Sequence, residues 1–134
     1  MGALCPLFYS LNIHLMILKP AKRSASRVRV ALYGASGSGK TYSALELAKG
    51  LTVNNNIAVV DTEAGSAHLY SHLGSFQVLS LDAPFTPERC IEALNACIAA
   101  GADVIVFDSL SHEWEGAGGI LEMHAQMPGN SFAN

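Results

Sequence analysis

The feature that most constrains this chain is the segment Gly-Ala-Ser-Gly-Ser-Gly-Lys-Thr at residues 34–41. It matches the pattern G-x-x-x-x-G-K-[ST] at every fixed position and lies between an apolar run and a helix-forming run. Glycines let backbone N–H groups turn inward around phosphate oxygens, and a following helix points its positive dipole end at the same anion. The segment therefore predicts a P-loop, which binds the phosphates of a nucleoside triphosphate, and we expect this to be ATP with Mg²⁺.

The motif assigns a role to each kind of residue in it. Backbone groups of the loop would bind phosphate oxygens, the Lys40 ammonium would reach the β- and γ-phosphates, and the Thr41 hydroxyl would ligate Mg²⁺. Tyr42 could approach the adenine, although packing is the commoner role for such a tyrosine. The predicted cofactor-binding residues are Gly34, Ala35, Ser36, Gly37, Ser38, Gly39, Lys40, Thr41 and Tyr42.

The pattern around the motif predicts an α/β fold. Short β-rich or apolar runs are strand candidates at residues 28–33, 57–60, 76–81 and 104–107. Apolar residues at helical spacing predict helices over residues 41–49 and 87–100, with a weaker signal over 120–126. The helix over 87–100 has Thr86 as its N-cap and an apolar stripe of Cys90, Ile91, Leu94, Cys97 and Ile98. Strands that alternate with helices favour a parallel sheet flanked by helices.

An acidic residue ends the apolar run at residues 104–107. This residue, Asp108, has the form of a Walker B acid, because a carboxylate at the carboxyl end of a parallel strand faces the crevice where ligands bind. Together with the complete P-loop motif, this position predicts that Asp108 joins Thr41 in holding Mg²⁺.

Hydrolysis also requires an acceptor for a proton of the attacking water. Glu63, just after the strand that ends at Asp61, is one candidate, and Glu113 and Glu115 are the others. AAA+ ATPases usually carry a Glu directly after the Walker B Asp, but Ser109 stands there in this chain. We therefore predict Glu63 as the general base and Lys40 as the second catalytic residue.

Several strings in this order resemble a known family. Asp-Thr-Glu at 61–63 and Asp-Ser at 108–109 resemble the ATPase core of the RecA family, over residues 28–110. The longer strings at 61–66, 109–114 and 118–121 are similar to the RecA-like AAA-domain ATPases of tailed phages, which are associated with recombination and single-strand annealing. The resemblance implies that Lys40 and Thr41 bind phosphate and magnesium and that Glu63 polarises the attacking water. It further implies that Asp108 with Ser109 completes the magnesium site.

The same resemblance sets the expected organisation. RecA-like folds have a further strand between the P-loop strand and the Walker B strand, and this sequence ends before it. We therefore expect residues 27–134 to be the N-terminal part of a RecA-like P-loop NTPase domain, truncated at its C-terminus and poorly active alone. Residues 1–26 would be an extension outside the core, with Met1 or Met16 as the start. Single-stranded DNA or a DNA-annealing protein would be the partner of a homo-oligomer.

Composition narrows the remaining alternatives. Three cysteines without a C-x-x-C pair favour neither a disulfide framework nor a zinc knuckle, so we expect a cytoplasmic protein. The largely apolar stretch at residues 3–18 is shorter than the ~20 residues that a membrane span requires, so we expect no membrane anchor. A small-molecule P-loop kinase is an alternative, but such kinases usually place several arginines around the transferred phosphate. A truncated module that binds nucleotide without catalysis is the other alternative.

Overall fold

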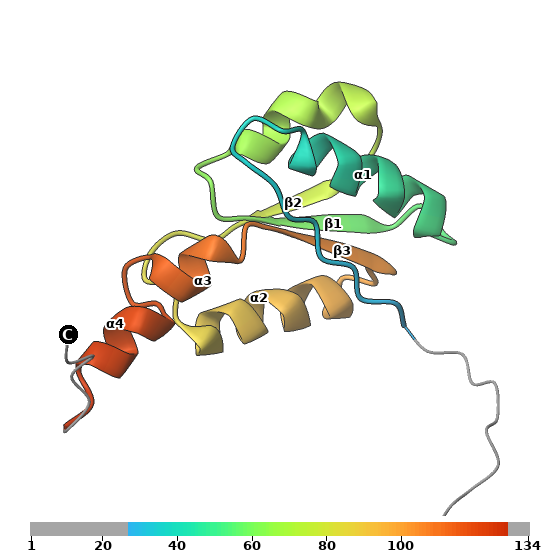
Figure 1. Ribbon diagram of the computed structural model, residues 1–134. Helices are drawn as coiled ribbons and strands as arrows, with labels where there is room; N and C mark the ends of the chain where they lie inside the picture. The colour runs from blue at the N-terminus through green and yellow to red at the C-terminus, as the bar shows by residue number, and fades with distance from the viewer. Residues whose placement is uncertain (1–26, 129–134) are drawn as a thin grey trace, which may run out of the picture. The chain divides into compact units, whose positions relative to one another are not determined.

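The computed structural model describes residues 27–128 (Figure 1). Contacts divide the chain into two units between Val30 and Ala31, and the described helices and strands all belong to the second unit. In chain order these elements are α1 (Lys40–Leu51), β1 (Ile57–Asp61), the 3₁₀ helix η1 (Ser66–Leu73), β2 (Gln77–Ser80), α2 (Pro87–Ala99), β3 (Val104–Asp108), α3 (Ser111–Glu115) and α4 (Ile120–Ala125).

The described strands form one parallel sheet in the order β2-β1-β3. The central strand, β1, pairs Asp61 with Ser80 on one side and with Asp108 on the other. The carboxyl ends of all these strands therefore lie along one edge, where parallel sheets bind ligands. This arrangement confirms the predicted α/β class with a parallel sheet.

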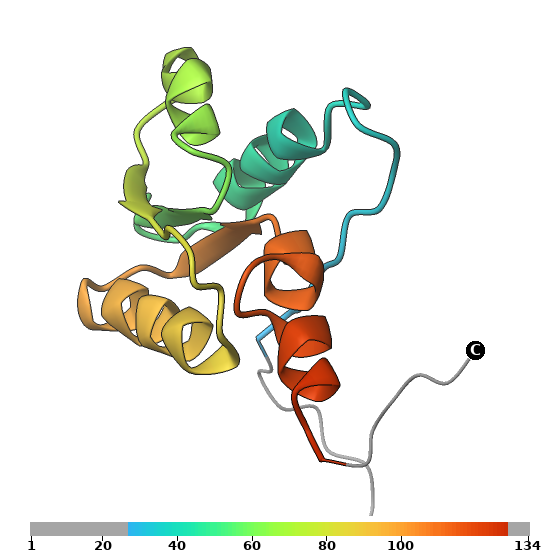
Figure 2. The ribbon, with the colours of Figure 1, turned by 90° about the vertical axis from the view of Figure 1, so that its left-hand side faces the viewer.

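Helices cover both faces of this sheet (Figure 2). Side chains alternate along β1, so that Val59 packs with Leu45 of α1 and Ala67 of η1, whereas Val60 packs with Cys90 of α2. Val59 and Val60 are completely buried, and burial of each contributes about 1.5–3 kcal/mol. These two hydrophobic clusters, one on each face of the sheet, fix the position of α1 relative to the ends of the strands.

The buried face of α2 differs from the predicted stripe. Cys90 and Cys97 are buried as expected, but Ala93 is buried with them while Ile91 and Ile98 are 56% and 50% exposed. Small side chains let the helix backbone approach the sheet closely, and periodicity alone does not distinguish this face from the adjacent one. Burial raises the pKa of both thiols.

The predicted strand at residues 28–33 is not formed within the described residues, 27–128. Val28, Val30, Leu32 and Tyr33 are all exposed. A strand requires a neighbour that accepts and donates its backbone hydrogen bonds, and the apolar pattern carries no information about that neighbour. The prediction was therefore wrong for the strand, although the helix after the loop forms as expected.

Asp103 joins the chain after α1 to the start of β3. Its carboxylate accepts hydrogen bonds from the backbone N–H groups of Val53 and Asn54, both at 2.8 Å, and from the Thr52 hydroxyl at 3.0 Å. The Asn54 amide is the largest of the influences that lower the pKa of Asp103 to about 2. The ionised form is therefore favoured by the folded state.

Asp103→Asn is expected to lower the melting temperature at pH 7 by a few degrees. Because the folded pKa is depressed, the ionised carboxylate stabilises the fold above the unfolded pKa of about 3.9, and this contribution is lost as the pH falls toward 2. The difference between wild type and variant should close over that window in thermal melts. Asp82→Asn, at an exposed loop position, is the matched control. A gap that persists below pH 2 would contradict the assignment.

Candidate functional site

The glycine-rich loop at residues 34–39 leads directly into α1. Gly37 and Gly39 have φ angles of 73° and 82°, in the left-handed region that favours glycine, and Gly39 caps the helix without any side-chain hydrogen bond. A Cβ on Gly34 would meet the Ser38 Oγ at 2.8 Å. The first turn of α1 thus presents amide groups without a side-chain cap, which suits an anion such as phosphate.

Lys40, the first residue of α1, folds back over this loop. Its Nζ donates hydrogen bonds to the carbonyl oxygens of Gly34, at 3.0 Å, and Ala35, at 2.8 Å. The ammonium is thereby held above the same loop whose amides would bind phosphate. These residues place a positive charge and backbone donors together, as binding of a nucleoside triphosphate requires.

Thr41 lies in the first turn of α1 and contacts the end of β3. Its hydroxyl donates a hydrogen bond to Oδ2 of Asp108 at 2.7 Å, across 67 residues of sequence. Both are hard oxygen ligands of the kind that Mg²⁺ prefers. No group of three or more His, Cys, Asp or Glu side chains within residues 27–128 could hold a metal ion. Magnesium commonly needs only one or two protein ligands besides phosphate and water oxygens, so the Thr41–Asp108 pair fits this ion.

Asp61, at the end of β1, organises the turn that carries Glu63. It is 1% exposed, and its two carboxylate oxygens accept hydrogen bonds from the backbone N–H groups of Glu63, at 2.7 Å, and Ala67, at 2.9 Å. The turn contains Ala64 and Gly65, both with positive φ. Asp61 therefore has its carboxylate occupied by the backbone, while the Glu63 side chain is exposed to solvent.

Thr62 joins this turn to the end of β3, and sequence reasoning did not single it out. Its backbone N–H donates to the Asp108 carbonyl at 2.8 Å. Its hydroxyl oxygen accepts from the Ser109 N–H at 2.9 Å and lies 3.1 Å from the Ser109 carbonyl and 2.8 Å from Nδ1 of His112. Thr62 is thus bonded to the end of β3 at Asp108, and Glu63 is the next residue along the chain. Its position between Asp61, at the strand end, and Glu63 was the sequence signal for this role.

The other predicted residues make none of the hydrogen bonds described above. Glu113 is partly buried in α3, and its charge is the second cause, after burial, that raises the pKa of Cys90 on α2. Glu115 is exposed at the last position of α3, and Tyr42 is 48% exposed on α1.

A family model described as an AAA domain matches residues 26–130. The chain belongs to this family. Membership in this family indicates a nucleotide-binding ATPase domain. Such domains generally bind ATP with Mg²⁺, in agreement with the predicted cofactors. No curated protein and no solved structure matches the chain.

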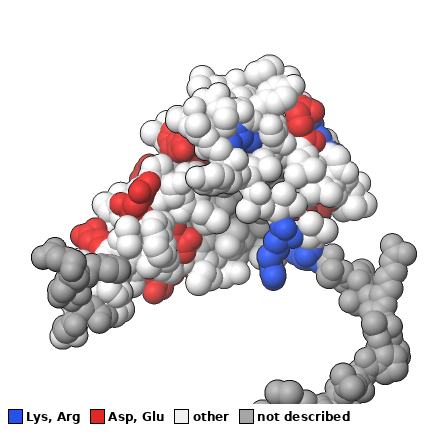
Figure 3. Space-filling model, in the orientation of Figure 1, with Lys and Arg blue, Asp and Glu red and all other residues white. Residues whose placement is uncertain are grey.

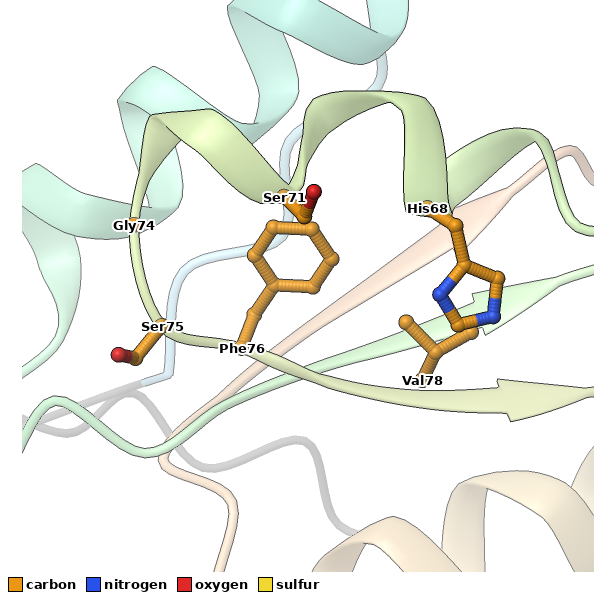
Figure 4. Close-up of a pocket in the computed structure, with 6 residues that line it drawn as sticks. All are labelled: His68, Ser71, Gly74, Ser75, Phe76 and Val78. Atoms are coloured by element: carbon orange, nitrogen blue, oxygen red, sulfur yellow. The ribbon is translucent and has the colours of Figure 1, made fainter.

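Two further structural observations bear on this AAA domain. None of the helices described between residues 27 and 128 is long and apolar enough to cross a membrane. A surface hollow of about 320 Å³ lies between η1 and β2, and Figure 4 shows the side chains around it. Its lining residues, His68, Ser71, Gly74, Ser75, Phe76 and Val78, include none of the predicted site residues.

Proposed function

We propose that this AAA domain binds ATP with Mg²⁺ at residues 34–41 and hydrolyses it in support of DNA recombination or single-strand annealing. The observation that carries the proposal is the 2.7 Å hydrogen bond between Thr41 and Asp108. It joins the end of the glycine-rich motif to the strand-end acid, two features that are 67 residues apart and that nucleotide hydrolysis needs together. The recombination role is supported by the resemblance of the strings at 61–66, 109–114 and 118–121 to tailed-phage ATPases.

Each residue of the site has a proposed role. The amides of the loop and the Lys40 ammonium would bind the phosphates, since Lys40 already lies over the loop carbonyls of Gly34 and Ala35. Thr41 and Asp108, assisted by Ser109, would hold Mg²⁺, which when bound neutralises phosphate charge. The chain's own contribution is to fix the Thr41 and Asp108 oxygens against one another before the nucleotide arrives.

Glu63 is the proposed general base. Thr62 holds its backbone beside the Asp108 strand end, and Asp61 holds its N–H, so the glutamate is positioned while its carboxylate stays accessible. A general base must approach the water that it deprotonates, which an exposed side chain on a fixed backbone can do. Glu113 is a weaker candidate because it is partly buried on α3, whereas the Glu63 side chain is exposed.

The scarcity of basic residues in the C-terminal half of the domain determines how we propose that DNA is engaged. Arg89 is the one lysine or arginine between Asp82 and Glu122, and its guanidinium donates to the carbonyls of Asp82 and Pro84. Several separate acidic side chains are visible on the surface in this part of the domain, among mostly uncharged residues (Figure 3). Such a surface repels phosphates, so we propose that single-stranded DNA is engaged through a DNA-annealing partner or through an oligomer of this chain.

Phosphate release from ATP, measured with and without Mg²⁺ and with and without single-stranded DNA, tests this proposal. Slow, magnesium-dependent hydrolysis by this chain is the expected result, and light scattering on the same sample would report the oligomeric state. Transfer of the γ-phosphate to a small acceptor instead of water would favour a kinase. Nucleotide binding without phosphate release, with or without DNA and the annealing partner, would contradict the ATPase role.

A further inference from the structure

His112 connects the proposed catalytic edge to α3, and no role in nucleotide chemistry accounts for it. Its Nδ1 lies 2.8 Å from the Thr62 hydroxyl oxygen. Its ring stacks on Phe85, with centroids 5.0 Å apart and planes inclined by 20°. The imidazole is therefore held from two sides, by an aromatic ring and by the threonine that stands next to Glu63.

The hydroxyl of Thr62 can donate its proton to only one of two nearby acceptors. It has one proton, and both the Ser109 carbonyl and Nδ1 of His112 lie within reach, while the Ser109 N–H occupies one of its lone pairs. If Nδ1 carries no proton, Thr62 donates to it. If Nδ1 is protonated, it donates to Thr62, whose proton then turns to the Ser109 carbonyl. The state of His112 is thus linked to a hydrogen bond at the residue that follows Asp108.

Residues 116 and 117, which follow α3, are in close contact with His112 and Phe85 and are expected to move with them. The Gly116 N–H donates to the His112 carbonyl at 2.8 Å, and a Cβ on Gly116 would meet that oxygen at 2.5 Å and Phe85 at 2.8 Å. The Phe85 N–H in turn donates to the Ala117 carbonyl at 2.7 Å. A displacement of His112 would therefore be transmitted along α3 and into the turn before α4.

We propose that Thr62 and His112 form a positioning pair that couples the nucleotide site to α3. The inference rests on the proposed function, since it concerns the same strand ends. Nucleotide binding at Thr41 and Asp108 alters the Asp108–Ser109 backbone, Thr62 transmits the change through its hydroxyl, and His112 carries it to α3. In the reverse direction, the position of α3 sets how Thr62 holds Glu63 against Asp108.

Trp114 provides a direct readout of this coupling. It is the single tryptophan of the chain, lies on α3 two residues after His112, and is 55% exposed. Its emission responds to a change in solvent contact. Saturation of the full-length protein with ADP or a non-hydrolysable ATP analogue, in the presence of Mg²⁺, is expected to shift the Trp114 emission.

Thr62→Val tests the pair, because valine keeps the shape of threonine and removes only the hydroxyl. We expect turnover to fall about tenfold or more, KM for ATP to stay within about twofold, and the nucleotide-induced shift of Trp114 emission to disappear. Thr62→Ser should restore turnover and the emission shift. His112→Asn, which keeps a polar atom near the position of Nδ1, should retain more of both than His112→Ala does.

The control is His72→Ala. The Nδ1 atom of His72 lies 3.1 Å from the Leu69 carbonyl within helix η1, and this variant should behave as wild type. A Thr62→Val protein with wild-type turnover and a wild-type emission shift would show that the hydroxyl is not needed, and would overturn the proposal. A wild-type Trp114 emission that does not move at saturation would overturn it as well, while leaving the ATPase proposal intact. If calorimetry detects no nucleotide binding to the wild type, both proposals fail together.

Discussion

Replacing Lys40 with alanine is expected to weaken ATP binding by about tenfold to a hundredfold, because the charge-assisted hydrogen bonds of an ammonium to phosphate contribute about 1.5–3 kcal/mol. Lys40 is placed for this role, since its Nζ lies over the loop carbonyls of Gly34 and Ala35. Titration of a fluorescent ATP analogue in the presence of Mg²⁺ measures the change. The loss should be smaller for AMP, which lacks the β- and γ-phosphates.

The matched control is Lys49→Ala, on the same helix. Lys49 pairs with Glu46 and donates to the Leu73 carbonyl at 3.0 Å, so its loss affects packing against η1 and leaves the loop untouched. A thermal melt of each variant without nucleotide separates folding from binding. Wild-type affinity in a folded Lys40→Ala protein would remove the basis for a phosphate site in this loop.

Glu63→Gln is expected to lower turnover by about 10²–10⁴-fold while ATP affinity changes little, since an amide keeps the shape of the side chain and cannot accept the proton. The Glu63 backbone is held by Asp61 and flanked by Thr62, both buried, so the substitution should leave the turn in place. Single-turnover hydrolysis at saturating ATP separates the chemical step from binding and from product release.

Two further glutamates serve as controls for that experiment. Glu115→Gln alters an exposed position at the end of α3 and should retain wild-type turnover. Glu113→Gln should also retain most of the activity, because Glu113 is partly buried on α3 and Glu63 is the proposed general base. A large loss in Glu113→Gln together with normal turnover in Glu63→Gln would move the general base to α3.

Much of the fold follows from local patterns in the sequence. The helices α1 and α2, the strands β1 and β3 and the short helix α4 lie within one or two residues of the predicted bounds. The N-cap of α2 also forms as predicted, with the Thr86 hydroxyl accepting from the Arg89 N–H at 3.4 Å. By contrast, η1 and α3 were not predicted, because both are short and neither has a regular apolar face.

The loop and its lysine were determined by the sequence alone. Glycines at 37 and 39 have positive φ and α1 begins at Lys40, and each of these features depends on residues a few positions apart. The same holds for the strand-end acids Asp61 and Asp108, which follow continuous apolar runs. Local sequence can specify these features because backbone freedom, helix initiation and strand propensity are properties of short segments.

The tertiary structure decided which of these residues meet and which do not. Asp61 has its carboxylate bound by two backbone amides, whereas Thr62 and His112 form the link between the strand ends and α3. Residues 28–33, with a strand-like pattern, form no strand among the described residues. The physical reason is common to these outcomes. A hydroxyl, a carboxylate or a strand edge acquires its role from a partner that is distant in sequence, and the register that brings Asp61 beside Asp108 exists only in the folded sheet.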